Sequence, residues 1–312
     1  MNLINSMINI SIVIPVYNSE DNLVELFTQI QKNLSNIKFE VILVNDQSKD
    51  NSWQIIKQLS LENNNIIGIN LRKNSGQDNA IFAGIHYAKG EYVVIMDDDL
   101  QHAPSDIVNL YAKVQQGYDI CYANFEKKKQ ALWKNIGSWI NGKMAEIIID
   151  KPKGIYLSPF KIIKKDIINE IKRTQYLYPY IDGIIFSITN NITQIKAEHY
   201  KRFSGKSNYT LIESIRVFMK LATGFSVFPL RVASFVGTSS ALIGFTLGLF
   251  FIMEYFIDNT APKGWTSLSI LILFIGGIIL MSLGIVGEYL GRIYLNINKK
   301  QAYTIKEEVN NE

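Results

Sequence analysis

Hydrophobic residues along the first 125 positions form short runs that alternate with segments of helical spacing. The runs are apolar and largely β-branched, and they cover residues 10–14, 39–44, 66–71 and 92–96. Between them, apolar residues recur every three or four positions, as they do at Leu23, Leu26, Phe27 and Ile30. Such short runs suit strands buried on both faces, and the spacing between them suits amphipathic helices. The alternation predicts βαβ units and an α/β fold with a mostly parallel sheet flanked by helices. Further elements are expected as a helix over residues 76–88 and strands over residues 119–125 and 195–199.

Carboxylates stand where two of these strands end. Asp46 follows the second strand, and Asp97, Asp98 and Asp99 follow residues 92–96. An acidic triplet can be no more than a solvated loop, but ligands of open α/β sheets bind beyond the carboxyl ends of the strands. Hard cations prefer carboxylate oxygens together with phosphate oxygens. Because Asp97 and Asp99 are alternate residues, the sequence predicts that both face one side and hold a metal–diphosphate group.

Composition and motifs exclude several other classes of protein. No Gly-x-Gly-x-x-Gly follows the first strand and no Walker sequence occurs, which argues against dinucleotide-binding and P-loop sites. The net charge of +4 is too small to indicate nucleic-acid binding. The single cysteine, Cys121, excludes an internal disulfide and has the apolar neighbours of a core residue.

The last third of the chain carries two uncharged apolar segments, residues 232–253 and 264–287. Each has about the 20 residues needed to cross a bilayer. Basic residues lie outside the pair, and the link between them carries acidic residues and one lysine. The positive-inside rule then predicts a transmembrane hairpin with both chain ends in the cytoplasm. The amphipathic residues 211–230 suit a helix on the membrane surface, with packing on the preceding domain as the alternative.

Several motifs, taken in order, make the chain resemble the family-2 glycosyltransferases of the polyprenyl-phosphate type. Relatives of this type include dolichyl-phosphate mannose synthase and the bacterial undecaprenyl-phosphate glycosyltransferases. The motifs are residues 14–20, 44–50, 74–77, 96–102, 205–209 and 287–292. The resemblance implies a GT-A fold followed by the two-helix transmembrane hairpin. The expected parts are a cytoplasmic GT-A domain (1–210), a juxtamembrane helix (211–230), two membrane helices (231–291) and a cytoplasmic tail (292–312).

The resemblance also assigns roles to residues. Those implied to bind the nucleotide sugar are Pro15, Tyr17, Glu20, Asp46, Gln77 and Asp97. Those implied to hold Mg²⁺ or Mn²⁺ are Asp97, Asp99 and Gln101, with Asp99 and Gln101 also catalytic. Those expected to bind phosphate of the donor or the lipid are Arg202, Lys206 and Ser207.

The chain departs from the family pattern at two places, and the second departure leaves the catalytic base open. Asn45 stands where relatives often carry an aspartate, so that Asp46 acts alone. Residues 158–161 read Ser-Pro-Phe-Lys where relatives commonly have an acid before a Phe-Arg pair. A lipid phosphate is already ionised and needs no base. Asp182 is the other candidate, against the reading of it as an ordinary turn carboxylate.

The expected function is therefore metal-dependent, inverting transfer of a sugar, such as a hexose, from a nucleoside diphosphate to a polyprenyl phosphate. The donor is expected to be a UDP-sugar rather than a GDP-sugar, and undecaprenyl phosphate is the expected lipid. The product would serve cell-envelope glycan modification, in the bacterial cytoplasmic membrane, and association of identical chains is left open. Two other classes remain: a non-catalytic membrane scaffold with a nucleotide-sugar-binding domain, and a nucleotidyltransferase.

Overall fold

The computed structural model describes residues 8–125, 146, 149–173, 179–197, 228–258, 264–297 and 301–310. The chain divides into two compact units, which are described separately. The first unit comprises Met1–Asn208 with Lys300–Glu312, and the second comprises Tyr209–Lys299.

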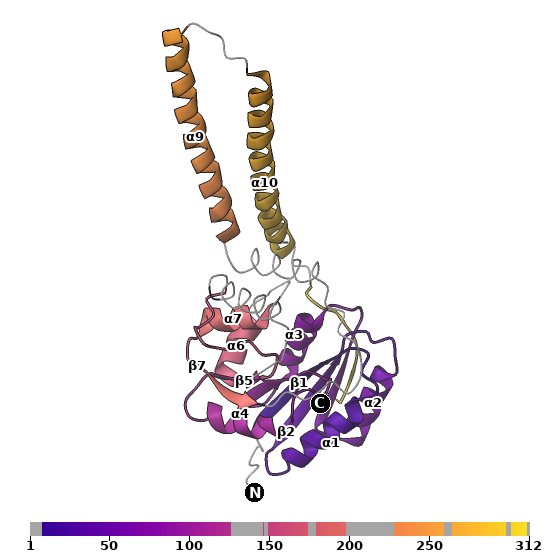
Figure 1. The fold of residues 1–312 in the computed structure, drawn as a ribbon. Coiled ribbons are helices and arrows are strands. Elements are labelled where there is room, and N and C mark those ends of the chain that lie inside the picture. Colours follow the sequence, from indigo (N-terminus) through magenta and orange to yellow (C-terminus); the bar gives the residue numbers. More distant parts are fainter. Residues whose placement is uncertain are drawn as a thin grey trace. The chain divides into compact units, whose positions relative to one another are not determined.

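The first unit is built on one eight-stranded sheet with helices on both sides (Figure 1). Its strands are β1 (Ile10–Val16), β2 (Phe39–Asn45), β3 (Ile66–Leu71), β4 (Tyr92–Ile95), β5 (Ile120–Phe125), β6 (Lys161–Lys164), β7 (Ile192–Ala197) and β8 (Ile305–Val309). Its helices are α1 (Leu23–Asn33), α2 (Ser52–Glu62), α3 (Gln77–Tyr87), α4 (Asp106–Val114), α6 (Lys165–Arg173) and α7 (Ile181–Ile188).

The sheet has the strand order β7-β5-β6-β4-β1-β2-β3-β8. Strands β4, β1, β2 and β3 run parallel to their neighbours in that group, and β5 is parallel to β7. Strand β6 is antiparallel to both β4 and β5, and β8 is antiparallel to β3. The sheet is therefore mixed: the predicted parallel arrangement holds for the first four strands, and the two antiparallel strands were not expected.

Strands β1 to β5 are buried on both faces, which is why they are apolar at successive positions. On one face, buried residues of α1, α2 and α4 form a single hydrophobic cluster with alternate residues of β1, including Ile12 and Ile14. On the other face, α3 lies close to β1 and β2, where the Gly84 Cα comes so near Val13 that an added Cβ would lie 2.5 Å from its Cγ1. The absence of a side chain at Gly84 therefore allows α3 to pack closely on the sheet.

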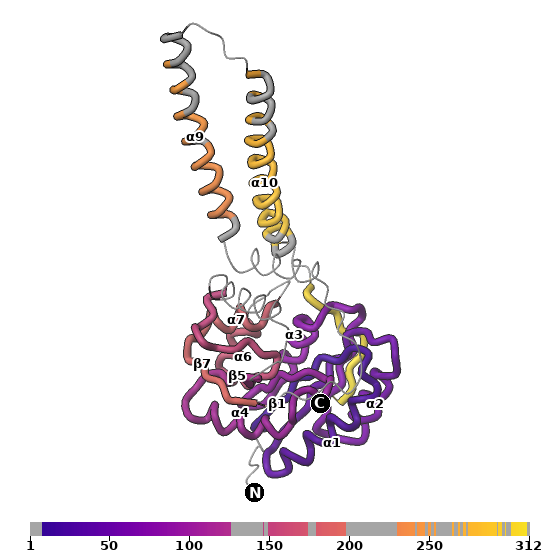
Figure 2. Tube along the Cα trace, viewed as in Figure 1, coloured from indigo at the N-terminus to yellow at the C-terminus, as the bar shows by residue number. Residues whose placement is uncertain are grey.

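Strand β8 belongs to the first unit although it comes from the far end of the chain. It pairs with β3, and the yellow C-terminal segment lies beside the indigo N-terminal elements (Figure 2). The Trp53 indole donates to Glu307 over 3.0 Å, and the Tyr87 hydroxyl donates to Glu308 over 2.5 Å. The sequence had indicated only a tail over these residues.

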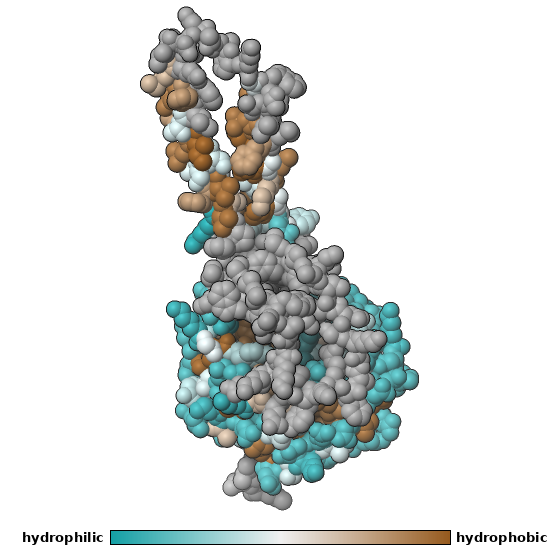
Figure 3. All heavy atoms as spheres, viewed as in Figure 1, coloured by the Kyte–Doolittle hydropathy of each residue, from teal (hydrophilic) through white to brown (hydrophobic). Residues whose placement is uncertain are grey.

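The second unit contains two long helices that lie side by side, α9 (Phe228–Asp258) and α10 (Trp265–Ile297) (Figure 1). Their described side chains are largely hydrophobic (Figure 3). Among the described residues, one helix is long and apolar enough to cross a membrane, at Phe274–Gly291 of α10. A shorter apolar stretch of α9 covers Leu230–Thr246. The two-helix transmembrane hairpin is thus not confirmed and stays a prediction.

Candidate active site

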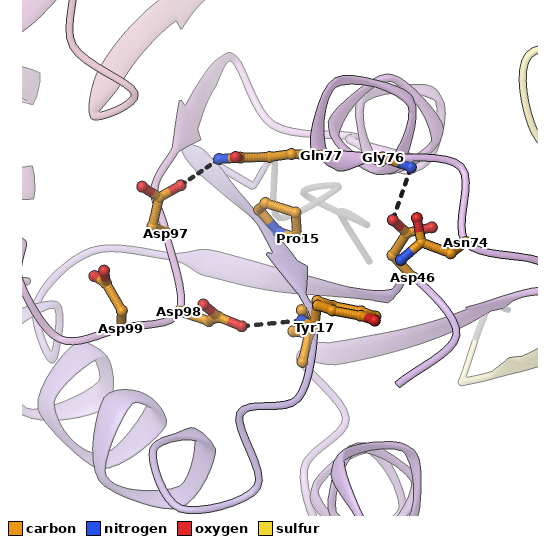
Figure 4. A pocket seen from close by; sticks show the side chains of 10 residues that line it. Pro15, Tyr17, Asp46, Asn74, Gly76, Gln77, Asp97, Asp98 and Asp99 are labelled. Atoms are coloured by element: carbon orange, nitrogen blue, oxygen red, sulfur yellow. Dashed lines mark hydrogen bonds between the residues drawn. The ribbon is translucent and has the colours of Figure 1, made fainter. Parts of the chain in front are cut away.

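A cavity of about 350 Å³ opens at the carboxyl ends of β1, β2 and β4 (Figure 4). Because these strands are parallel neighbours, their ends and the loops that follow them meet at one edge of the sheet. The cavity is lined by Pro15, Val16, Tyr17, Asp46, Asn74, Gly76, Gln77, Asp97, Asp98 and Asp99. It therefore brings together five of the six residues expected to bind the nucleotide sugar, together with Asp99.

The acidic turn after β4 is held by bonds within it and by aromatic rings behind it. Leu100 adopts a positive φ of 57°, and the Gln101 N–H donates to Asp99 over 3.1 Å. The His102 ring is buried and stacks between two phenylalanine rings, with centroids 5.1 Å from that of Phe125 and 5.2 Å from that of Phe160. A turn anchored in this way presents its carboxylates from a fixed position.

The middle carboxylate of the turn, Asp98, points away from its two neighbours. It accepts a hydrogen bond from the Tyr17 backbone N–H over 3.2 Å, whereas the side chain of Asp97 is directed toward Gln77 (Figure 4). Burial raises the pKa of the Asp98 carboxyl to about 6, although hydrogen bonds from Ser19 and Tyr17 oppose the rise. Asp98 therefore ties the loop after β1 to the turn after β4.

The carboxylate of Asp46 is engaged by the loop that leads into α3. Its oxygens accept hydrogen bonds from the Ser75 N–H over 2.6 Å and the Gly76 N–H over 2.8 Å. Burial raises the pKa of Asp46 above its ordinary value, and these two hydrogen bonds oppose the rise. Gly76 has φ 90°, a backbone conformation that favours glycine.

Gln77, the first residue of α3, reaches across the cavity to the acidic turn. Its side-chain amide donates to the Asp97 Oδ1 over 2.7 Å (Figure 4). Tyr17 lies on the opposite wall with 47% of its surface exposed, and Pro15, two residues before it, is buried. An aromatic ring that is half exposed beside a cavity can stack against a planar group such as a nucleotide base.

Other predicted residues lie elsewhere. Glu20 is not part of the cavity lining, and its carboxylate accepts a hydrogen bond from the Asn51 N–H over 2.7 Å. Gln101 is also outside the lining. Asp182, in the first turn of α7, is 9% exposed and is paired with Lys161.

Three further predicted residues, Arg202, Lys206 and Ser207, lie outside the described residues. The sequence reasoning gave no role to Asn74 or Asp98, which line the cavity, or to the buried His102. The motifs at residues 74–77 and 96–102 contain all three, but local sequence does not tell which side chains of a motif face a cavity.

Asp97 and Asp99 fit a divalent ion that shares its coordination with a ligand. Within the described part of the chain, no three His, Cys, Asp or Glu side chains are grouped so that they could hold an ion on their own. Two carboxylates at a cavity suit Mg²⁺ or Mn²⁺ when phosphate oxygens and water complete the coordination. The arrangement can therefore hold a metal–diphosphate group rather than a metal alone.

A family model and similar proteins both relate this chain to glycosyltransferases. The sequence model of glycosyl transferase family 2 matches residues 11–172. An uncharacterized glycosyltransferase of Synechocystis sp. is 32% identical over 96% of this chain and 95% of its own length. The undecaprenyl-phosphate 4-deoxy-4-formamido-L-arabinose transferase of Proteus mirabilis is 30% identical over 96% of this chain and 94% of its own.

Among solved structures, the glucosyl-3-phosphoglycerate synthase of Mycobacterium tuberculosis has a similar fold. In its complex with Mn²⁺, UDP and phosphoglyceric acid, the TM-score is 0.53, with 14% identity over 69% of this chain and 76% of that one. This likeness supports the predicted GT-A fold.

Proposed function

The chain belongs to glycosyl transferase family 2, and from this premise we propose that it transfers a sugar from a nucleoside diphosphate to a polyprenyl phosphate. The observation that carries the proposal is the cavity in which Asp97 and Asp99 stand opposite Tyr17 (Figure 4). One wall suits a metal-bound diphosphate, and the other suits a planar base. A nucleotide sugar contains both a planar base and a diphosphate, and the ribose joins them.

The donor would lie across the ends of the three strands. The base and ribose would contact Pro15, Tyr17 and Asp46, which line the cavity. The diphosphate would lie toward Asp97 and Asp99, where Mg²⁺ or Mn²⁺ would offset the charge that develops on the leaving group. The Mycobacterium tuberculosis synthase was solved with Mn²⁺ and UDP, which makes a UDP-sugar the first donor to test.

The proposed reaction inverts the configuration of the sugar. An oxygen of the acceptor phosphate attacks the anomeric carbon from the side opposite the nucleotide. A bond forms between that oxygen and the carbon, while the bond to the β-phosphate oxygen breaks and its electron pair stays on the nucleoside diphosphate. Because the acceptor phosphate is ionised near neutral pH, no base has to remove a proton from it before it attacks. Asp182 stays the candidate should a base take part.

The acceptor is proposed from the relatives and from the apolar helix. The Proteus mirabilis relative is named for undecaprenyl phosphate, and α10 carries a stretch able to cross a bilayer. We expect Arg202, Lys206 and Ser207 to hold a phosphate group, since arginine offers a planar fork and serine a hydroxyl donor. With the predicted hairpin, the protein would lie in the cytoplasmic membrane with its catalytic domain and both termini in the cytoplasm.

A donor screen on the full-length protein in detergent tests the proposal. UDP- and GDP-sugars would be supplied with undecaprenyl phosphate and Mn²⁺, and the released nucleotide would be identified by chromatography. We expect release of a nucleoside diphosphate that depends on the lipid. Release of pyrophosphate would instead indicate a nucleotidyltransferase. Binding of UDP without turnover of any donor would favour the scaffold.

A further inference from the structure

Residues 74–77 cross the cavity between two strands that are not neighbours in the sequence. At one end, Ser75 and Gly76 donate their backbone N–H groups to Asp46, which follows β2. At the other end, the Gln77 amide donates to Asp97, which follows β4 (Figure 4). We call residues 74–77 the strap.

Polar bonds account for the described attachments of the strap. Asn74, Gly76 and Gln77 are exposed, and nothing lies within 4 Å of the position that a Gly76 Cβ would occupy. The strap is thus not wedged in place by packing at Gly76. Further bonds join the Asn74 N–H to Gln47 over 2.9 Å and the Asn79 amide to the Ser75 carbonyl over 2.7 Å.

The bond from Gln77 differs from the others because its acceptor is a residue expected to face the metal. An amide that donates to one carboxylate oxygen fixes the rotation of that carboxylate, as the partners of metal-binding side chains commonly do. The Gln77 bond to the Asp97 Oδ1 is 2.7 Å long, which is short for a donor on nitrogen. It therefore defines which oxygen of Asp97 faces the strap.

We propose that Gln77 is a positioning residue that orients Asp97 for the divalent ion and holds the strap over the nucleotide site. The inference rests on the proposed function, because it assumes a metal-bound nucleotide in this cavity. The strap residues that bind Asp46 and Asp97 are almost adjacent, since only Gly76 separates Ser75 from Gln77. The strap therefore links the base side of the cavity at Asp46 to its diphosphate side at Asp97. Loss of the Gln77 amide should therefore act on both sides.

Substitution Gln77→Met removes the amide and keeps the length of the side chain. We expect the affinity for UDP in the presence of Mn²⁺ to fall by about tenfold to a hundredfold, as for loss of other partners of metal ligands. Titration calorimetry on the full chain in detergent measures this affinity. Hydrogen exchange should become faster at the Ser75 and Gly76 amides, while the melting temperature changes little.

Gln29→Met is the matched control. It removes a bond of equal length and type, from the Gln29 amide to Glu25 over 2.7 Å on the exposed face of α1. We expect affinity and exchange at the strap to stay as in the unmodified protein. If Gln77→Met shows the same unchanged values as this control, the inference is wrong.

A second variant separates the two roles of Gln77. Gln77→Lys keeps a donor to Asp97 but adds a positive charge, so the strap amides should stay protected while Mn²⁺-dependent UDP binding weakens. Fast exchange at the Ser75 and Gly76 amides in this variant would contradict the inference that a donor at position 77 holds the strap. Failure of the unmodified protein to bind UDP with Mn²⁺ would count against the proposed function. The exchange data would still test whether Gln77 holds the strap in place.

Discussion

The Tyr122 hydroxyl in β5 donates a hydrogen bond to the Asp182 Oδ1 in α7 over 2.7 Å. The same oxygen accepts a hydrogen bond from the Lys161 ammonium group, which lies 5.1 Å from the centre of the Tyr122 ring. All three residues are buried. Burial and the nearby carboxylate hold the pKa of Tyr122 well above its ordinary value. The candidate base is thus enclosed by partners that engage its carboxylate.

Substitution Asp182→Asn should destabilise the protein. It leaves the buried Lys161 without its counter-charge, and breaking a buried pair in this way costs about 3–5 kcal/mol. Thermal unfolding in detergent should show a clear fall in melting temperature. The double variant Lys161→Met/Asp182→Asn should recover most of the loss, because it removes both charges and keeps an oxygen that can accept from the Tyr122 hydroxyl. A single variant as stable as the unmodified protein would contradict the role of the pair.

Turnover of the same double variant tests whether Asp182 transfers a proton. Because Tyr122 and Lys161 both bind the Asp182 carboxylate, a structural role for Asp182 is favoured over proton transfer. We therefore expect a folded double variant to keep turnover within about tenfold of the unmodified protein. Loss of turnover by two orders of magnitude or more in a variant that unfolds normally would support Asp182 as the base.

Chelation should abolish turnover, and Mn²⁺ or Mg²⁺ should restore it. Asp99→Ala should lower the rate by about a hundredfold or more, roughly the effect of losing one electrostatic stabiliser. Asp98→Asn is the control, because an asparagine oxygen can still accept the hydrogen bond from the Tyr17 N–H. Full activity of Asp99→Ala in the presence of EDTA would contradict the proposed metal dependence of turnover.

Removal of residues 301–312 should destabilise the sheet edge at β3. The truncation removes β8, the bond from Trp53 to Glu307 and the bond from Tyr87 to Glu308. Since hydrogen bonds to charged groups are worth about 1.5–3 kcal/mol each, we expect a fall in melting temperature and a greater tendency to aggregate through the bared edge. Removal of residues 311–312 alone serves as control. An unchanged melting temperature after the longer truncation would show that β8 adds no stability.

Cysteine labelling tests the predicted membrane topology without removal of the native thiol. Cys121 is fully buried, and burial raises its pKa to about 12, so it should not react with a maleimide at neutral pH. In intact cells, Asn259→Cys should react with an impermeant maleimide and Asn298→Cys should not. The unmodified protein is the control. Reaction at position 298 but not at 259 would reverse the topology.

Periodicity predicts most elements of the first 125 residues because burial leaves a repeat in the sequence. The pattern over residues 76–88 predicts a helix, and α3 spans Gln77–Tyr87; the run over 119–125 predicts a strand, and β5 spans Ile120–Phe125. The antiparallel strands escape this reasoning. Strand β6 begins and ends in lysine, and β8 has charged residues at its three central positions. Such strands form because a neighbouring edge offers hydrogen bonds, and that edge lies far away in sequence.

The sequence by itself determined that Asp46, Asp97 and Asp99 stand at strand ends, since alternating strands and helices bring the carboxyl ends of parallel strands to one edge. Only the tertiary structure decided what the acidic residues contact. Asp46 binds backbone groups of the strap, Asp98 binds the backbone of Tyr17, and Asp182 is paired with Lys161. These partners lie between 21 and 81 positions away along the chain, and a local pattern carries no record of such distances. Their contacts depend on how strands and helices pack, which is set by the whole core rather than by any one motif.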